Sequence, residues 1–287
     1  MSLAPHQLVI AALEIGMLLT GAWLIARALG VADYRARLLD RSRLAHWELA
    51  GFEVTLLVLA IFLCGLIGQG VGHHYFADTI KQSPQRAGLE VVVYGLGFHG
   101  AALLGWPLFW LVRRMLHADY GAPPPPVLET RREPLAKILV HALSTVVIAL
   151  PALALISAAW NLVLRTAGLP DDPQDLLAVF GHVHSKPLLG AMLFVACVLA
   201  PINEELLFRG AIFRFCRQRF GRAPALLVSG VLFGALHGNW AGFVPLAMLG
   251  AVLALAYERT GDIRVSMIAH GLFNLNTLIV VLSGLDS

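Results

Sequence analysis

The sequence predicts an all-α membrane protein, a polytopic helical bundle with about eight transmembrane helices. Two observations predict this fold class. The 287-residue chain is 58% hydrophobic and only 14% charged, with a mean hydropathy of +0.74, whereas a soluble domain normally carries about a quarter charged residues. Apolar stretches of about 20 residues, the length that spans the core of a bilayer, also recur along the chain. We therefore expect an integral membrane protein.

The candidate spans are eight apolar stretches, of which the sixth and seventh are the shortest. They cover residues 8–29, 49–71, 91–112, 138–164, 188–213, 223–237, 243–257 and 265–282. The first stretch lacks the basic start and small-residue cleavage site of a signal peptide, so we expect it to remain as a spanning helix.

One low-complexity run interrupts the spans, four prolines at 123–126. A polyproline run is a stiff spacer. It suggests a division into residues 1–135, which hold the first helices and this linker and whose role is unknown, and residues 136–287, which hold the polar motifs described below.

The basic residues predict the orientation of the bundle. Sixteen of the 21 Lys and Arg residues fall in alternate loops: Arg27, Arg35, Arg37, Arg41, Arg43, Arg113, Arg114, Arg131, Arg132, Lys137, Arg214, Arg217, Arg219, Arg222, Arg259 and Arg264. The opposite loops hold Lys81, Arg86, Arg165 and Lys186. By the positive-inside rule the richer side is cytoplasmic, which places both termini outside the cytoplasm. The net charge of +3 comes from these loops, so it gives no sign of nucleic-acid binding, and the bilayer is the expected partner.

Four single polar residues lie within or near the ends of the first four spans, namely Glu14, Glu53, His99 and His141. Each stands alone in its stretch. We expect each to hydrogen-bond a neighbouring helix or to reach the membrane interface rather than to take part in chemistry, and we keep only Glu14 and His141 as candidates for a functional role.

The first cluster of polar residues inside a span is Glu204, Glu205 and Arg209. Ionisable groups in a membrane cost from a few to more than about ten kcal/mol each, so they mark functional sites or paired charges. Glu205 and Arg209 are four residues apart and can pair on one helix face. Glu204 is rotated from Glu205 by about 100° around the helix. We therefore expect a structural Glu205–Arg209 ion pair and a Glu204 side chain that faces a cavity.

Two further clusters follow at helical spacing. His237 ends the sixth span, after Gly230 and Gly234, whose GxxxG spacing lets helix backbones approach closely. His270 and Asn274 are four residues apart and share one face of the last span.

Counting residues from the cytoplasmic loops places Glu204, His237, His270 and Asn274 in the cytoplasmic half of the membrane, where they can meet. Such a set suits the hydrolysis of an amide. A poorly solvated carboxylate can take a proton from water, an imidazole can position the water and protonate the leaving amine, and hydrogen-bond donors can stabilise the oxyanion. Two histidines and one glutamate could instead bind a catalytic zinc ion.

The three polar clusters and the residues around them resemble the motifs of a known family. EELLFRG at 204–210, FGALH at 233–237 and HGLFN at 270–274 are similar to the three signatures of the CPBP intramembrane endopeptidases. This family includes the Rce1-like type II CAAX prenyl proteases and the Abi or bacteriocin-immunity proteins. The resemblance covers about a third of the chain, residues 187–282, and implies an all-helical protease core in residues 136–287.

The resemblance also implies roles for individual residues. Glu204 would activate water and His237 would assist it, while His270 and Asn274 would line the site as oxyanion or ligand groups. The active site would open toward the cytoplasm and the lipid, in a multi-pass protein of a bacterial inner membrane. The substrate would be a membrane-associated protein or peptide, prenylated or otherwise tethered to lipid.

The Glu205–Arg209 pair would support that site. Family members are commonly described as metalloproteases, and a glutamate-dependent mechanism without metal has also been argued. Both mechanisms stay open here, with Glu204, His237 and His270 as the candidate ligands of a divalent metal such as zinc.

Two other functions compete with the peptidase: a non-catalytic membrane immunity or scaffold protein, and a proton-coupled transporter. The lack of an internal repeat disfavours the transporter.

Overall fold

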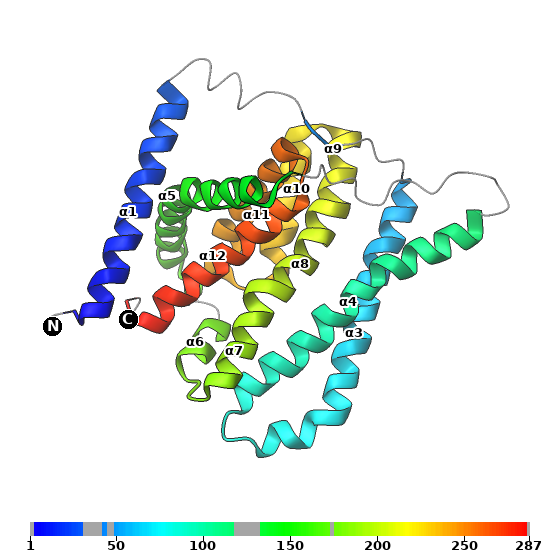
Figure 1. Ribbon diagram of the computed structural model, residues 1–287, viewed down its shortest axis with the longest axis horizontal. Helices are drawn as coiled ribbons and strands as arrows, with labels where there is room; N and C mark the ends of the chain where they lie inside the picture. Colours follow the sequence, from blue (N-terminus) through cyan, green and yellow to red (C-terminus); the bar gives the residue numbers. More distant parts are fainter. Residues whose placement is uncertain (1–2, 31–41, 45–48, 118–132, 173–174, 286–287) are drawn as a thin grey trace. The chain divides into compact units, whose positions relative to one another are not determined.

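The computed structural model describes residues 3–30, 42–44, 49–117, 133–172 and 175–285 (Figure 1). These residues form helices and their connections, with no β-strand among them, and the all-α fold class is confirmed. The proline run at 123–126 and several of the loop arginines lie outside the described residues.

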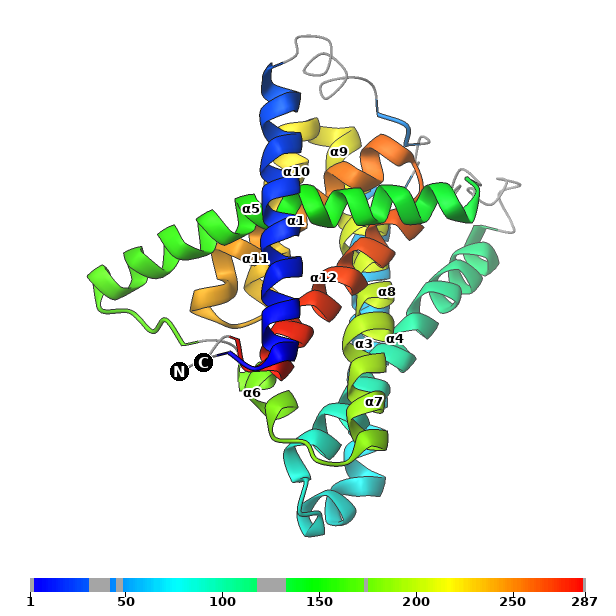
Figure 2. The same ribbon diagram turned by 60° about the vertical axis from the view of Figure 1, so that its left-hand side comes forward.

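The helices follow one another along the chain. They are α1 (Pro5–Gly30), α3 (Gly51–Gln82), α4 (Arg86–His117), α5 (Leu135–Ala167), α6 (Asp175–Gly181), α7 (Lys186–Phe194), η2 (Val195–Leu199), α8 (Ala200–Glu205), η3 (Leu206–Phe213), α9 (Arg214–Phe220), α10 (Arg222–Leu236), α11 (Trp240–Thr260) and α12 (Ile263–Ser283). The five segments from α7 to α9 are continuous and form one long helix, Lys186–Phe220, which Figure 2 shows from the side.

Seven helices of the described residues are long and apolar enough to cross a membrane, and the protein is an integral multi-pass membrane protein. The predicted sixth span differs. It forms α10, which has 15 residues and, at 1.5 Å per residue, is about 22 Å long, shorter than a hydrocarbon core of about 30 Å. Gly221 and Gly238, with φ angles of 84° and 62°, bound this helix. Glycine adopts such left-handed conformations without a steric cost, so the chain turns at both points.

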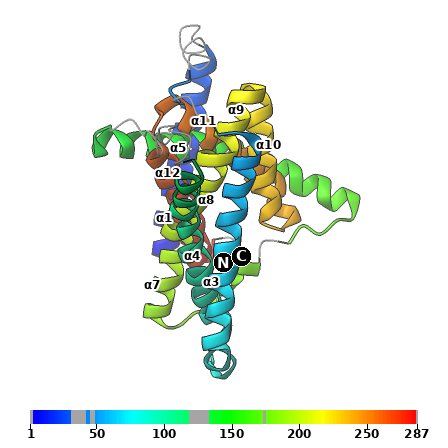
Figure 3. The same cartoon turned by 90° about the vertical axis from the view of Figure 1, so that its right-hand side faces the viewer.

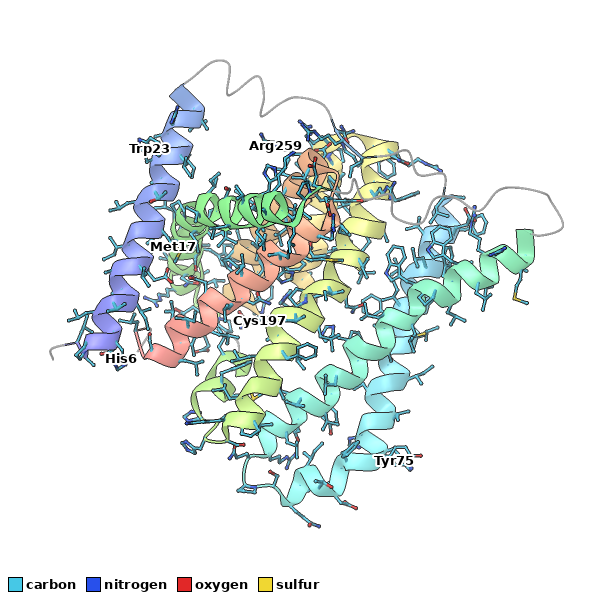
Figure 4. All side chains as sticks on the ribbon, in the orientation of Figure 1. His6, Met17, Trp23, Tyr75, Cys197 and Arg259 are labelled. Carbon is cyan, nitrogen blue, oxygen red and sulfur yellow. The ribbon has the colours of Figure 1, made fainter. Side chains whose placement is uncertain are left out.

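Outward-facing side chains fit a lipid environment. Large apolar residues such as Leu13 and Leu66 are exposed. The aromatic side chains of Trp23 and Tyr75 are 57% and 73% exposed and lie on the outside of the ribbon in Figure 4. In water such a surface would be unfavourable, whereas lipid chains solvate it.

The helices divide into two compact units, which are described separately. Unit 1 comprises Met1–Leu44, Arg131–Gly181 and Leu226–Ser287, and unit 2 comprises Ala45–Thr130 and His182–Ala225. Both units combine segments from the two halves of the chain. The functional division near residue 135, which assigns roles and not contacts, stays a prediction.

Unit 2 is built on a hairpin of α3 and α4 against which the long helix packs. A Cβ atom added at Gly68 would lie 2.2 Å from the Gly97 carbonyl oxygen, so only glycine allows the two backbones to come this close. The Gln85 side chain accepts a hydrogen bond from the Ser185 N–H at 3.4 Å. Since these residues precede α4 and α7, both helices start at the same end of the unit and run in the same direction.

Unit 1 holds both ends of the described chain. Gln7 at the start of α1 donates a hydrogen bond to the Ser283 carbonyl oxygen at the end of α12, at 2.9 Å. The start of α1 and the end of α12 accordingly lie close together (Figure 3). Which side of the membrane holds the termini stays a prediction.

Candidate active site

The predicted site residues fall into two groups, one in each unit. Glu204, Glu205 and Arg209 belong to unit 2, whereas His237, His270 and Asn274 belong to unit 1. Each group has its own internal geometry. The convergence of all four proposed catalytic residues stays a prediction.

In unit 2, Glu205 and Arg209 form a fully buried ion pair. Arg209 Nη1 donates to Glu205 Oε1 at 2.8 Å, and both side chains are 0% exposed. The contact expected from the four-residue spacing is therefore present. The guanidinium also lies 5.7 Å from the centre of the Phe208 ring. Two opposite charges in contact offset part of the cost of taking each of them out of water.

The helix around this pair is irregular, which the sequence did not predict. Two π-helical segments, η2 and η3, flank the α-helical turns of α8. Pro201 stands at the start of α8. Its ring would collide with the carbonyl group four residues earlier in a regular α-helix, so a wider turn before it relieves the clash. π-Helical turns are rare and frequently occur at functional sites.

Glu204 lies between these irregular turns, next to a histidine from another helix. Its carboxylate is near enough to the His99 imidazole of α4 to interact with it electrostatically. The neighbouring Asn203 is 2% exposed, and its Nδ2 donates to His99 Nδ1 at 3.3 Å. His99 thus hydrogen-bonds a neighbouring helix, as expected for a single polar residue in a span. Its position beside Glu204 was not expected.

In unit 1, His237 follows the last residue of α10 and is held by a main-chain group. Its Nδ1 lies 2.7 Å from the Phe233 carbonyl oxygen. Because a carbonyl oxygen can only accept, Nδ1 carries the hydrogen, and Nε2 of the neutral ring keeps its lone pair. That nitrogen can accept a proton or a hydrogen bond from water.

The two predicted histidines of unit 1 contact the same aromatic ring. Phe233, which is 0% exposed, lies with its ring centre 4.8 Å from that of His237 and 5.4 Å from that of His270. His270 belongs to α12 and is 2% exposed. Asn274 is half-buried one helical turn later, on the same face of α12. Phe233 therefore connects the end of α10 to α12.

The GxxxG pattern of α10 acts as predicted. Cβ atoms added at Gly230 and Gly234 would lie 2.5 Å from the Ala247 carbonyl oxygen and 2.4 Å from that of Phe243. Glycine at both positions allows α10 and α11 to touch through their backbones. This close contact fixes the end of α10, and His237 is the next residue along the chain.

The metal prediction concerns ligands from both units. In the part of the chain that the structure describes, no group of three or more His, Cys, Asp or Glu side chains is placed to hold a metal ion. Glu204 belongs to unit 2 and the two histidines to unit 1, so the three candidate ligands do not all lie within one unit, and zinc binding stays a prediction.

Comparison with known proteins places the candidate residues in one segment. Residues 186–276 match the model of the type II CAAX prenyl endopeptidase Rce1-like family. The resemblance to this family is confirmed over that segment. It contains all six candidate residues, whereas α1 to α5 lie outside it.

One of the relatives that the chain resembles has a name that agrees with this match. The chain is 29% identical over 115 residues to the "Putative membrane peptidase YdiL" of Bacillus subtilis (strain 168), an alignment that covers 40% of this chain and 45% of that protein. It is 35% identical over 86 residues to the UPF0177 protein YbdI of Lactococcus lactis subsp. lactis (strain IL1403), covering 29% of this chain and 44% of that protein. The chain thus spans less than half the length of either relative. No solved structure matches it significantly.

Proposed function

We propose that the chain is an intramembrane endopeptidase that hydrolyses a peptide bond of a membrane-associated protein or peptide. The observation that carries the proposal is the Rce1-like match of residues 186–276, because this segment holds every residue that sequence reasoning assigned to the reaction. The relative named as a membrane peptidase supports the same class of activity.

In this proposal Glu204 is the general base. It takes a proton from a water molecule, whose oxygen adds to the carbonyl carbon of the substrate. His237 Nε2, with its lone pair available, accepts a hydrogen bond from that water. When the C–N bond breaks, the proton that Glu204 took from the water passes to the leaving amine. His270 and Asn274 donate hydrogen bonds to the oxyanion, for which about 3–4 kcal/mol per donor is typical.

Glu205 and Arg209 have a different part in this scheme. Their ion pair is fully buried, with 2.8 Å between Arg209 Nη1 and Glu205 Oε1, so in this scheme it serves to hold the irregular helix. The proposal therefore assigns chemistry to only one of two adjacent carboxylates.

A zinc ion is the alternative means of activating water. Glu204, His237 and His270 would be its ligands, and a bound zinc would lower the pKa of the water. We propose the glutamate-dependent route, which needs no step through a metal. Incubation with phenanthroline separates the two: we expect turnover to persist, and loss of turnover that added zinc restores would favour the metal route.

The proposed substrate class follows from the membrane location of the residues. A peptide bond near the membrane is within reach of intramembrane groups, and a lipid-tethered peptide would be held there by its anchor. The family description names a prenylated substrate class, the CAAX proteins. We therefore propose a prenylated or otherwise lipid-tethered peptide, at the cytoplasmic side of a bacterial inner membrane.

The test is a cleavage assay in proteoliposomes with two quenched fluorescent probes, a farnesylated CAAX peptide and a single-span peptide without lipid. We expect the wild type to cleave at least one of them and Glu204→Gln to lose turnover by about 10²-fold or more. Equal turnover by the wild type and Glu204→Gln, or cleavage of neither probe, would contradict the proposal. The second outcome would favour the non-catalytic or transport function.

A further inference from the structure

We propose that His99 of α4 is a positioning residue for Glu204, so that the α3–α4 hairpin completes the candidate site from outside the family-matched segment. The inference rests on the proposed function for its meaning in catalysis. It assigns a task to a part of the chain that sequence reasoning left without a role.

The contacts of His99 point toward α8. Its Nδ1 accepts a hydrogen bond from Asn203 Nδ2 at 3.3 Å, and its ring interacts electrostatically with the Glu204 carboxylate. An amide nitrogen can only donate, so in the neutral imidazole the hydrogen lies on Nε2. A ring N–H is a suitable donor to a carboxylate or to a water bound to it. His99 therefore hydrogen-bonds Asn203 and lies within electrostatic range of Glu204, two consecutive residues of α8.

The backbone of α4 is packed to hold this position. One turn before His99, a Cβ atom added at Gly95 would lie 2.6 Å from Val195 Cγ1 of η2. On the other side, the Phe98 ring lies edge-on to His99 with ring centres 5.2 Å apart. That same ring would lie 2.7 Å from a Cβ atom at Gly65 of α3. The close packing leaves α4 little freedom to move His99 away from α8.

A purely structural role would not require this neighbour. The Asn203 amide is 2% exposed and a buried amide needs a partner, but many acceptors would serve. An imidazole that accepts at one nitrogen keeps a donor at the other, and a carbonyl acceptor would supply no such donor within electrostatic range of the Glu204 carboxylate. The arrangement fits a residue that orients Glu204.

The test compares His99→Ala with His99→Gln in the proteoliposome assay described above, using the probe that the wild type cleaves. We expect His99→Ala to lower kcat about tenfold or more with KM unchanged, and to lower the thermal unfolding midpoint because the buried Asn203 amide loses its acceptor. His99→Gln should recover part of kcat, because its carboxamide oxygen can accept from Asn203. A wild-type kcat in His99→Ala, or no recovery in His99→Gln, would overturn the proposal.

The matched control is His73→Gln. His73 belongs to the same hairpin and is exposed, and its Nδ1 is hydrogen-bonded to the hydroxyl of the half-buried Tyr94 at 2.8 Å. We expect wild-type kcat from this variant. An equal loss in His73→Gln and His99→Gln would overturn the assignment to His99.

A readout without substrate separates this inference from the proposed function. The infrared carboxylate band that disappears in Glu204→Gln reports on Glu204 directly. We expect His99→Ala to shift that band, and an unmoved band would overturn the inference even if the protein were not a peptidase. If Glu204→Gln cleaves the probe like the wild type while the band does shift, the proposed function fails and the His99–Glu204 interaction stands.

Discussion

The two groups of candidate residues are held in place by different forces. In unit 2, the residues are charged, and a fully buried ion pair of Glu205 and Arg209 stabilises an irregular helix. In unit 1, a main-chain carbonyl group holds His237, one aromatic ring contacts both His237 and His270, and α10 touches α11 through glycines.

The difference shows how a membrane protein can bury polar groups at different cost. A charge in an apolar environment requires an opposite charge. The stability of unit 2 therefore depends on the presence of both Glu205 and Arg209. An imidazole can be neutral and satisfied by one carbonyl oxygen. We therefore expect unit 1 to depend on shape, and expect replacement of His237 to have little effect on folding.

The largest expected effect on stability is that of Glu205→Gln. Removing the carboxylate breaks a buried ion pair and leaves the Arg209 guanidinium without its Glu205 partner, which costs about 3–5 kcal/mol of unfolding free energy. Thermal or denaturant unfolding in detergent measures this loss. Restoration of stability by the double variant Glu205→Leu with Arg209→Met would confirm that the loss comes from breaking the pair.

The control for that variant is Glu90→Gln, which breaks the exposed pair with Arg86 in the same unit. We expect a change of less than about 1 kcal/mol, because water solvates both groups. Equal losses of unfolding free energy from the buried pair and the exposed pair would contradict this prediction.

The next effect concerns activity and not stability. We expect His237→Ala to lower kcat by about 10²–10⁴-fold, the usual contribution of a residue that moves protons, with the unfolding midpoint nearly unchanged. His6→Gln, an exposed histidine at the start of α1, is the control and should leave both values unchanged. A large loss of stability in His237→Ala would show that unit 1 depends on this side chain in the way unit 2 depends on Glu205.

The smallest effect tests the role of shape in unit 1. Gly234→Ala places a methyl group 2.4 Å from the Phe243 carbonyl oxygen, so α10 and α11 must separate, at about 1–3 kcal/mol. Gly16→Ala in α1 meets nothing within 4 Å and should be neutral or stabilising by up to about 1 kcal/mol. Comparing the two unfolding midpoints checks the prediction, and equal midpoints would contradict it.

Local rules in the sequence predicted much of this architecture. Hydropathy identified the helices, because about 20 apolar residues are needed to cross a bilayer. The four-residue spacing predicted the contact of Glu205 with Arg209, and the GxxxG spacing predicted the contact of α10 with α11, since both depend only on helical geometry.

Features set by tertiary packing could not be predicted in this way. His99 and Asn203 are 104 residues apart in the chain, and no spacing rule joins them. The π-helical turns around α8 follow from Pro201 and from packing, and no residue pattern marks their length. The short α10 was predicted as a span on hydropathy alone, although the glycines at both of its ends limit its length.

The division of labour between the two adjacent carboxylates is the central claim, and one paired measurement tests it most directly. Turnover of the lipidated probe and the unfolding midpoint would be determined for Glu204→Gln and Glu205→Gln under the same conditions. We expect Glu204→Gln to lose turnover while keeping the wild-type midpoint, and Glu205→Gln to lose stability first. A stable but inactive Glu205→Gln beside an active Glu204→Gln would contradict the account.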